Sequence, residues 1–100
     1  MLSKFRTYGL AVELYRMCEN VKAPRYQRDQ LLRASLSVVL NLAEGSAKPT
    51  AQERRRFYAI ALGSVREVQA LLDLMHQDAA FELADQVGAY VYKLTHPAVA

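Results

Sequence analysis

The segment QLLRASLSVVLNLAEG, from Gln30 to Gly45, decides the fold of this chain. Between Leu31 and Ala43 the only polar side chains are those of Arg33, Ser35, Ser37 and Asn41. A helix as apolar as this needs neighbours on several sides. Because a chain of 100 residues makes at most a small bundle, we expect some of those neighbours to belong to other subunits.

Three of these polar residues form one narrow line on the predicted helix. Arg33, Ser37 and Asn41 follow one another at i, i+4 spacing, and Glu44 extends the line. Arg33 and Glu44, at the two ends of the line, are able to form buried ion pairs between helices or subunits, and so are Arg66 and Glu67 on the third predicted helix. We interpret these positions as determinants of register and assembly.

Length and composition describe one globular domain. The chain has 100 residues, of which 52% are hydrophobic and 23% charged, which suits a single core. We expect the domain to cover residues 1–96, with 97–100 as a frayed tail. No stretch has the length and purity of a membrane span, and the N-terminus lacks an apolar signal core, so a cytoplasmic location is expected. The one cysteine, Cys18, has apolar neighbours and is predicted to be a buried, unreactive thiol.

Apolar periodicity predicts four helices, over about residues 3–21, 26–45, 51–75 and 79–95. In the first of them Phe5, Tyr8, Val12 and Tyr15 recur at helical spacing, and Leu14, Met17 and Cys18 widen the stripe, which is the pattern of an amphipathic helix. Short connections between the helices favour an all-α, antiparallel up-down-up-down four-helix bundle.

Local signals mark the end of the second helix and the start of the third. Gly45 is predicted to close the second helix in the left-handed conformation, and Thr50-Ala-Gln-Glu53 has the pattern of a capping box. Within the third helix, Gly63 costs about 1 kcal/mol relative to alanine, so we expect another helix backbone to approach closely there. Ser64 is expected to bond to a carbonyl one turn earlier or to a neighbouring helix.

Charge is distributed unevenly along the chain. Residues 1–66 carry 12 Lys/Arg against 5 Asp/Glu, and residues 67–100 carry 1 against 5, so a net +7 precedes a net −4. Such polarity points to an anionic partner for the basic part, with nucleic acid first, or to head-to-tail contact between subunits. A surface kept soluble by its charge is the plain alternative.

Three consecutive arginines, Arg54 to Arg56, lie in the first turn of the third helix, where the helix dipole disfavours each cation by about 0.3–1 kcal/mol. This placement makes sense if phosphates approach that end of the helix. Further basic residues lie in or near loops. The candidate nucleic-acid contacts are therefore Arg25, Arg28, Lys48, Arg54, Arg55 and Arg56. Solvated surface, or salt bridges between subunits, is the alternative role for this set.

No residue pattern supports catalysis or a bound cofactor. Glu44 and Glu67 would need a second carboxylate, a histidine or a metal ion nearby, and His76 and His96 have no Cys or His at ligand spacing. Phosphate loops, nucleophile elbows and dinucleotide fingerprints are absent from the sequence. We therefore expect a non-enzymatic protein without catalytic residues, metal or cofactor.

Two segments, Gln30–Ser46 and Arg56–Val68, resemble the four-helix-bundle proteins of the 23S rRNA intervening-sequence family. That family includes the accessory variability determinant of diversity-generating retroelements. The similarity covers about residues 5–95. The matching signature positions are Arg33, Ala34, Ser37, Asn41, Glu44, Gly45, Gly63, Ser64 and Glu67.

The resemblance implies a small cytoplasmic bundle that assembles into a barrel-like homopentamer. It also implies a basic surface that meets nucleic acid, RNA or DNA, and in retroelements a reverse transcriptase as a protein partner. The signature positions are then fold and assembly positions and not catalytic ones. A protein–protein adaptor without a nucleic-acid role is the second hypothesis, and a small nuclease is the third.

Overall fold

The computed structural model of the protein describes residues 2–97, with side chains from Phe5 onward. Over this range the chain forms four helices and no strand. The helices are α1 (Leu2–Glu19), α2 (Arg25–Ser46), α3 (Ala51–Leu74) and α4 (Asp78–Thr95). The predicted all-α fold with four helices is confirmed.

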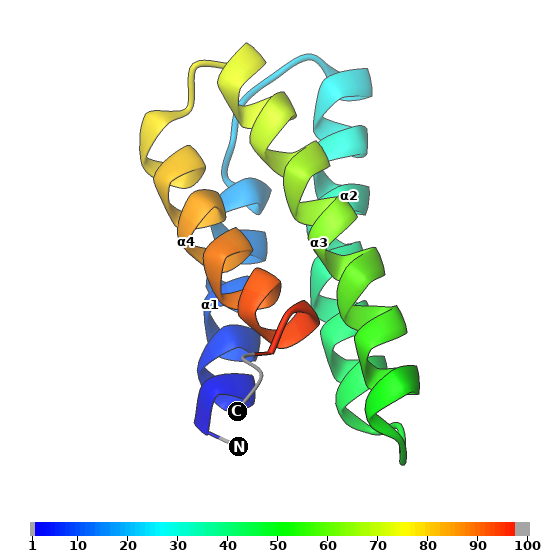
Figure 1. Ribbon diagram of the computed structural model, residues 1–100. Coiled ribbons are helices and arrows are strands. Elements are labelled where there is room, and N and C mark those ends of the chain that lie inside the picture. The colour runs from blue at the N-terminus through cyan, green and yellow to red at the C-terminus, as the bar shows by residue number, and fades with distance from the viewer. Residues whose placement is uncertain (1, 98–100) are drawn as a thin grey trace.

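The helices form an elongated bundle measuring 44 × 20 × 18 Å, in which each helix packs against two neighbours. α2 lies between α1 and α3, and α4 lies between α3 and α1. Figure 1 shows the two chain ends and the α2–α3 connection at one end of the bundle, here named the termini end, and the other two connections at the opposite end. None of the described helices is both long and apolar enough to cross a membrane.

The core face of α1 differs from the predicted one. Phe5 is 73% exposed and Tyr8 42%, while Val12 and Tyr15 are half-buried. The fully buried side chains of this helix are those of Thr7, Ala11, Leu14 and Cys18. The predicted stripe is therefore confirmed for Leu14 and Cys18 and wrong for Phe5 and Tyr8, while Val12, Tyr15 and Met17 border the core. Thr7 and Ala11 take the place of the two rings on the core face, since small side chains let helices pack closely.

Gly45 lies inside α2, because the helix continues to Ser46, and no described glycine has a positive φ. The predicted left-handed closure is therefore wrong. The position requires space instead. A Cβ atom built on Gly45 would lie 2.9 Å from Cε1 of Tyr58 and 3.0 Å from Cβ of Phe57. The absence of a side chain at Gly45 thus lets α3 pass close to the last turn of α2.

The predicted cap of α3 forms. Thr50 Oγ1 accepts a hydrogen bond from the Glu53 backbone amide at 3.2 Å, and Thr50 has the extended backbone of an N-cap residue. Among the described residues the Glu53 carboxylate does not accept from the Thr50 amide in return, so only half of the capping box is present. The cap makes Ala51 the first residue of the helix, so Arg54 completes the first turn and Arg55 and Arg56 lie in the second, one turn later than the sequence indicates.

The middle of the polar line of α2, Ser37 and Asn41, faces α3, while Arg33 and Glu44 at its ends are exposed. Ser37 Oγ and Ser64 Oγ lie 2.8 Å apart, and Asn41 Nδ2 donates to the carbonyl and hydroxyl oxygens of Ser37, at 2.9 and 3.1 Å. Ser64 therefore bonds to a neighbouring helix, which is one of its two predicted outcomes. A connected set of side-chain hydrogen bonds of this kind favours one register of α3 against α2.

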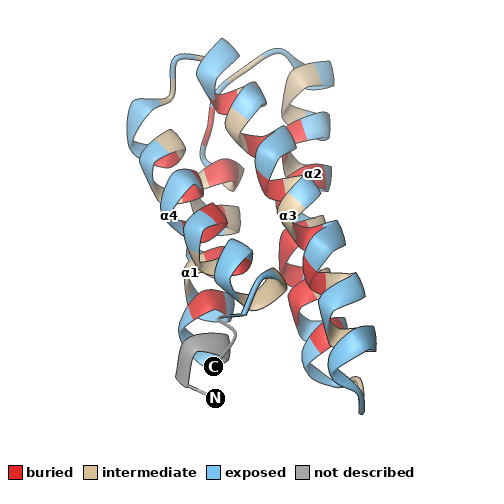
Figure 2. Cartoon of the chain, viewed as in Figure 1, coloured by how far each residue is buried: buried red, intermediate tan, exposed pale blue. Residues whose placement is uncertain are grey.

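The side of α2 and α3 that points away from the core exposes large apolar side chains among its charged ones. Leu36 and Leu40 on α2 are 40% and 57% exposed, and Ile60 on α3 is 46% exposed. Gly63 is also exposed, and a Cβ atom built there would meet nothing within 4 Å, so no described helix approaches it and that prediction is wrong within one chain. We call Leu36, Leu40, Ile60 and Gly63 the outer face. Figure 2 shows the exposed surface that runs along both helices.

Cys18 is fully buried, as predicted, and its surroundings suppress ionisation. Burial raises the pKa of the Cys18 thiol from 9.0 to about 11, and a side-chain hydrogen bond with Ser35 offsets part of the rise. The folded chain therefore favours the neutral thiol. Its contribution to stability is fully present below pH 9.0 and is lost as the pH rises through about 11.

We expect this loss to be measurable against a Cys18→Ala variant, which has no thiol to ionise. The free energy of unfolding of the unmodified chain should fall relative to that of the variant by up to about 2 kcal/mol between pH 9 and 11. Denaturant unfolding of both proteins across this pH range measures the difference. If the difference in free energy of unfolding between the two proteins stays constant over this range, burial does not raise the pKa of the thiol.

Candidate nucleic-acid interface

The structure places the six basic candidates at the two ends of α2. Arg25 and Arg28 lie in its first turn, at the end opposite the chain termini. Lys48 follows its last turn, and Arg54 to Arg56 begin α3 beside it. Because α2 has 22 residues, about 30 Å separates the two groups. The candidates therefore form two separate basic groups and not one continuous patch.

The group at the start of α2 is largely engaged within the chain. Arg28 Nη2 donates to the carbonyl oxygen of Glu19 at 2.8 Å, which ties α2 to the last turn of α1. Arg25 Nε lies 3.9 Å from the Asp29 carboxylate, one helical turn away, and both side chains are well exposed. Arg28 thus has a structural role, and Arg25 is partly neutralised by Asp29.

The second group, Lys48 with Arg54, Arg55 and Arg56, is named the basic tip. Two of its members hold the α2–α3 connection together. Arg54 Nη1 donates to the carbonyl oxygen of Lys48 at 3.0 Å. Lys48 Nζ lies 3.2 Å from the Glu44 carboxylate and 5.1 Å from the centre of the Phe57 ring. These contacts fix the backbone of the connection. Arg55 and Arg56 therefore extend from a well-ordered part of the chain.

Arg55 and Arg56 are exposed, and neither makes an ion pair or side-chain hydrogen bond with any described residue. Each therefore has a full set of guanidinium donors available to an anion. Arg56 also borders a shallow hollow of about 260 Å³, shared with Lys48, Glu53 and Phe57. The hollow combines the guanidinium group of Arg56 and the ammonium group of Lys48 with the Glu53 carboxylate and an aromatic ring, and its guanidinium group is able to bind a phosphate.

The described residues contain no group of three or more His, Cys, Asp or Glu side chains that could hold a metal ion. Glu44 pairs with Lys48, as described above, and Glu67 is exposed on α3. His96 stacks on Tyr92, with 4.0 Å between ring centres. The chemistry that this surface offers is thus the binding of anions by exposed guanidinium groups.

Comparison with known families identifies the chain. The model of the 23S rRNA-intervening sequence protein family matches residues 5–95. The chain belongs to this family. No curated protein and no solved structure matches it.

In this 23S rRNA-intervening sequence family protein, the signature positions divide by location. Ala34 and Gly45 are buried in the bundle, and Ser37, Asn41 and Ser64 form the hydrogen-bonded set between α2 and α3. The remaining signature positions, Arg33, Glu44, Gly63 and Glu67, are exposed.

The predicted buried ion pairs of the family protein are absent within the described chain. Arg33 makes no ion pair with a described residue, and Glu44 pairs with Lys48 at the surface. Arg66 is exposed, and its Nη1 donates to Gln69 Oε1 at 2.8 Å. Arg66 therefore bonds to Gln69, and it makes no ion pair with Glu67. These charges lie on the outward sides of α2 and α3, where the core cannot enclose them.

Sequence reasoning missed two features of this family protein. Arg28 and Arg54 bond backbone carbonyls at the helix connections, and no sequence pattern distinguishes such an arginine from a solvated one. A cavity near the termini end, described below, was hidden because its aromatic residues Phe5 and Tyr8 were assigned to the core. The one sequence signal for this cavity is that the first helix carries more large apolar side chains than one face holds, so some of them must lie outside the core.

Proposed function

We propose that this protein is a non-enzymatic homo-oligomer, in the cytoplasm, that binds RNA or DNA through its basic tip. The observation that carries the proposal is the pair of exposed arginines, Arg55 and Arg56, which no described side chain neutralises and which lie near the start of α3. The family name, which refers to 23S rRNA, supports an RNA-related role.

The proposed assembly is a barrel-like ring, with five antiparallel up-down-up-down bundles as the number implied by the family resemblance. The outer face supports it, since Leu36, Leu40 and Ile60 expose apolar surface that a second copy of the chain would cover. Repetition around a ring also strengthens a weak site, because several basic tips then meet one polyanion at once.

The role we infer for such a ring is accessory. It brings no reaction of its own and presents nucleic acid to a larger partner, a reverse transcriptase if the gene belongs to a retroelement, or a ribosomal RNA partner otherwise. Turnover of labelled RNA by the purified protein, abolished by Glu44→Gln or Glu67→Gln, would contradict the non-enzymatic part.

A matched pair of double variants tests the nucleic-acid part. Arg55→Gln/Arg56→Gln removes two charges from the basic tip, and Lys22→Gln/Arg25→Gln removes two charges at the opposite end of α2. We expect the first to weaken binding at least tenfold and to make affinity less sensitive to salt, because fewer counterions are released. The second should change affinity by less than about twofold. Fluorescence anisotropy with single-stranded and duplex RNA and DNA at two salt concentrations measures both quantities.

Three outcomes would overturn the proposed binding: no binding by the unmodified protein, an affinity that does not depend on salt, or equal losses of affinity in the two variants.

The unequal charge of the chain, +7 before Glu67 and −4 from Glu67 onward, favours one other function. In a protein–protein adaptor these regions of adjacent subunits would neutralise each other. That function predicts that Arg55→Gln/Arg56→Gln breaks the assembly in a protein that never bound nucleic acid.

A further inference from the structure

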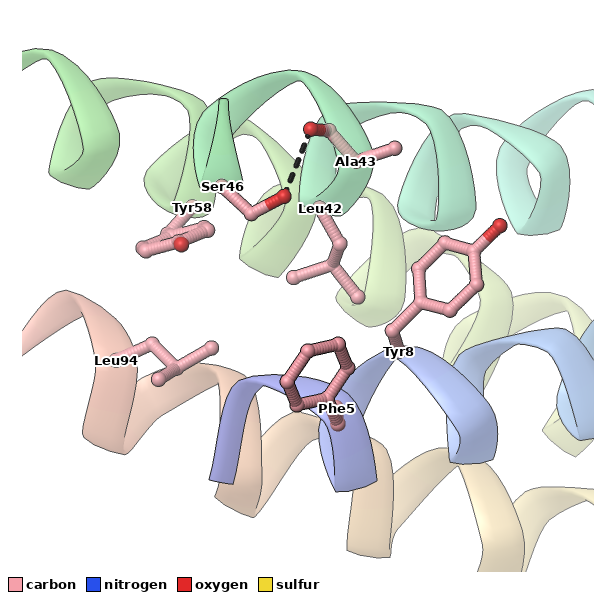
Figure 3. A pocket seen from close by; sticks show the side chains of 7 residues that line it. All are labelled: Phe5, Tyr8, Leu42, Ala43, Ser46, Tyr58 and Leu94. Carbon is pink, nitrogen blue, oxygen red and sulfur yellow. Dashed lines mark hydrogen bonds between the residues drawn. The ribbon is translucent and has the colours of Figure 1, made fainter. Parts of the chain in front are cut away.

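A cavity of about 360 Å³ opens between the α1–α4 pair and the α2–α3 pair, near the termini end. All four helices contribute to its wall. The lining residues are Phe5, Tyr8, Leu42, Ala43, Ser46, Tyr58 and Leu94. Figure 3 shows Phe5, Tyr8 and Leu94 on one side and Leu42, Ala43 and Ser46 on the other. Its size and apolar walls are those of a site for a small molecule.

Tyr58 supplies the polar group of this wall. Its side chain is only 3% exposed, and the hydroxyl oxygen has no hydrogen-bond partner among the described residues. The ring lies close against Gly45, since a Cβ atom built there would be only 2.9 Å from its Cε1 atom. A buried hydroxyl without a partner destabilises the folded chain, and such a group normally has a reason. The hydroxyl oxygen exposes less than 1 Å², so a bound molecule with one hydrogen-bonding oxygen would become its partner after a small shift of the surrounding side chains.

The rim of the cavity points to a molecule that is largely hydrocarbon. Phe5 is 73% exposed and Tyr8 42%, although both are aromatic residues beside an apolar wall. Removing these rings from water would favour binding in proportion to the apolar area that is covered. Ser46 does not donate to a ligand, because its hydroxyl already donates to the carbonyl oxygen of Ala43 at 2.9 Å, which leaves the Ser46 oxygen only as an acceptor.

The wall also excludes ions, because none of its seven residues carries a charge. A charged molecule would lose its hydration there without gaining a partner. We propose that the cavity binds a compact, uncharged, mostly hydrocarbon molecule with a single oxygen, of the phenol or ketone class, which hydrogen-bonds to the Tyr58 hydroxyl. This inference depends neither on nucleic-acid binding nor on assembly.

Three probes of one shape test the proposal at neutral pH: 2-naphthol, naphthalene and 2-naphthoate. Calorimetric titration of the unmodified protein should show that 2-naphthol binds about tenfold more tightly than naphthalene, which is the contribution of one hydrogen bond. The 2-naphthoate anion should bind more weakly than either. In Tyr58→Phe, which removes only the hydroxyl, the preference for 2-naphthol over naphthalene should disappear.

A cavity-filling variant and its control locate the site. Ala43→Phe adds a ring at the exposed edge of the cavity and should abolish binding of both neutral probes. Ala79→Phe adds the same ring at the exposed start of α4, at the opposite end of the bundle, and should leave binding unchanged. Circular dichroism of each variant confirms that it is folded.

The proposal is overturned if the unmodified protein binds none of the probes, if Tyr58→Phe keeps the preference for 2-naphthol, or if Ala43→Phe still binds. If no probe binds and Ala43→Phe also dissociates the assembly, the cavity is a contact between copies of the chain and not a ligand site.

Discussion

Replacing Gly45 with valine is expected to lower the free energy of unfolding by about 3 kcal/mol. The new side chain would collide with Cε1 of Tyr58 at 2.9 Å and with Cβ of Phe57 at 3.0 Å. The Tyr58 ring can turn only slightly, and the Cβ of Phe57 moves only with its backbone, so α2 and α3 must separate near the termini end. Denaturant unfolding at one fixed protein concentration measures the loss, since assembly makes stability depend on concentration.

Gly9→Val is the matched control for that experiment. Gly9 is an exposed glycine inside α1, and a Cβ atom built there would meet nothing within 4 Å. The same substitution should therefore raise the free energy of unfolding slightly, by less than about 0.5 kcal/mol, because valine is a better helix former than glycine. Similar losses at both positions would mean that Gly45 is not where α3 approaches most closely.

The contrast between these two glycines shows how far sequence reasoning reaches. Gly45 was recognised as a special position, but a glycine near a helix end has the same appearance whether it supplies a left-handed turn or room for a neighbour. The cap at Thr50 was predictable because its hydrogen bond is local, four residues being enough to define it. The packing around Gly45 depends on Tyr58, thirteen residues later, and only the tertiary structure supplies that contact.

The sequence predicted which basic residues are candidates for the site, but it did not predict how these residues are arranged in space. The arginines of α3 conflict with the helix dipole, and this conflict is visible in the sequence. Whether Arg25 and Arg28 join them depends on the length and direction of α2, which put the two groups at opposite ends. Similarly, apolar periodicity located α1 and its buried Leu14 and Cys18, but Phe5 and Tyr8 are as apolar as the residues that face the core, so periodicity alone did not separate them from it.

Introducing glutamate at two positions of the outer face, Leu40→Glu together with Ile60→Glu, is expected to dissociate the proposed ring into single chains. These side chains are 57% and 46% exposed in the isolated chain, so the variant should remain folded. In an assembly the change removes about 1.5–3 kcal/mol of apolar burial per side chain and places charges in the contact. Size-exclusion chromatography with light scattering measures the mass, and circular dichroism the helix content.

Tyr26→Glu is the control for the outer face. Tyr26 is 71% exposed at the start of α2, about 20 Å along the helix from Leu40. This variant should keep the mass of the unmodified assembly. If Leu40→Glu/Ile60→Glu also keeps that mass, the outer face is not the contact between copies.

The central claim is that α2 and α3 expose more apolar surface than one chain covers, so that copies of the chain associate through it. Sedimentation equilibrium of the unmodified protein at micromolar concentration tests this claim most directly. For a five-membered ring we predict a single species of about 57 kDa, five times the 11.3 kDa of one chain. A stable, compact species of 11.3 kDa across that concentration range would contradict the claim.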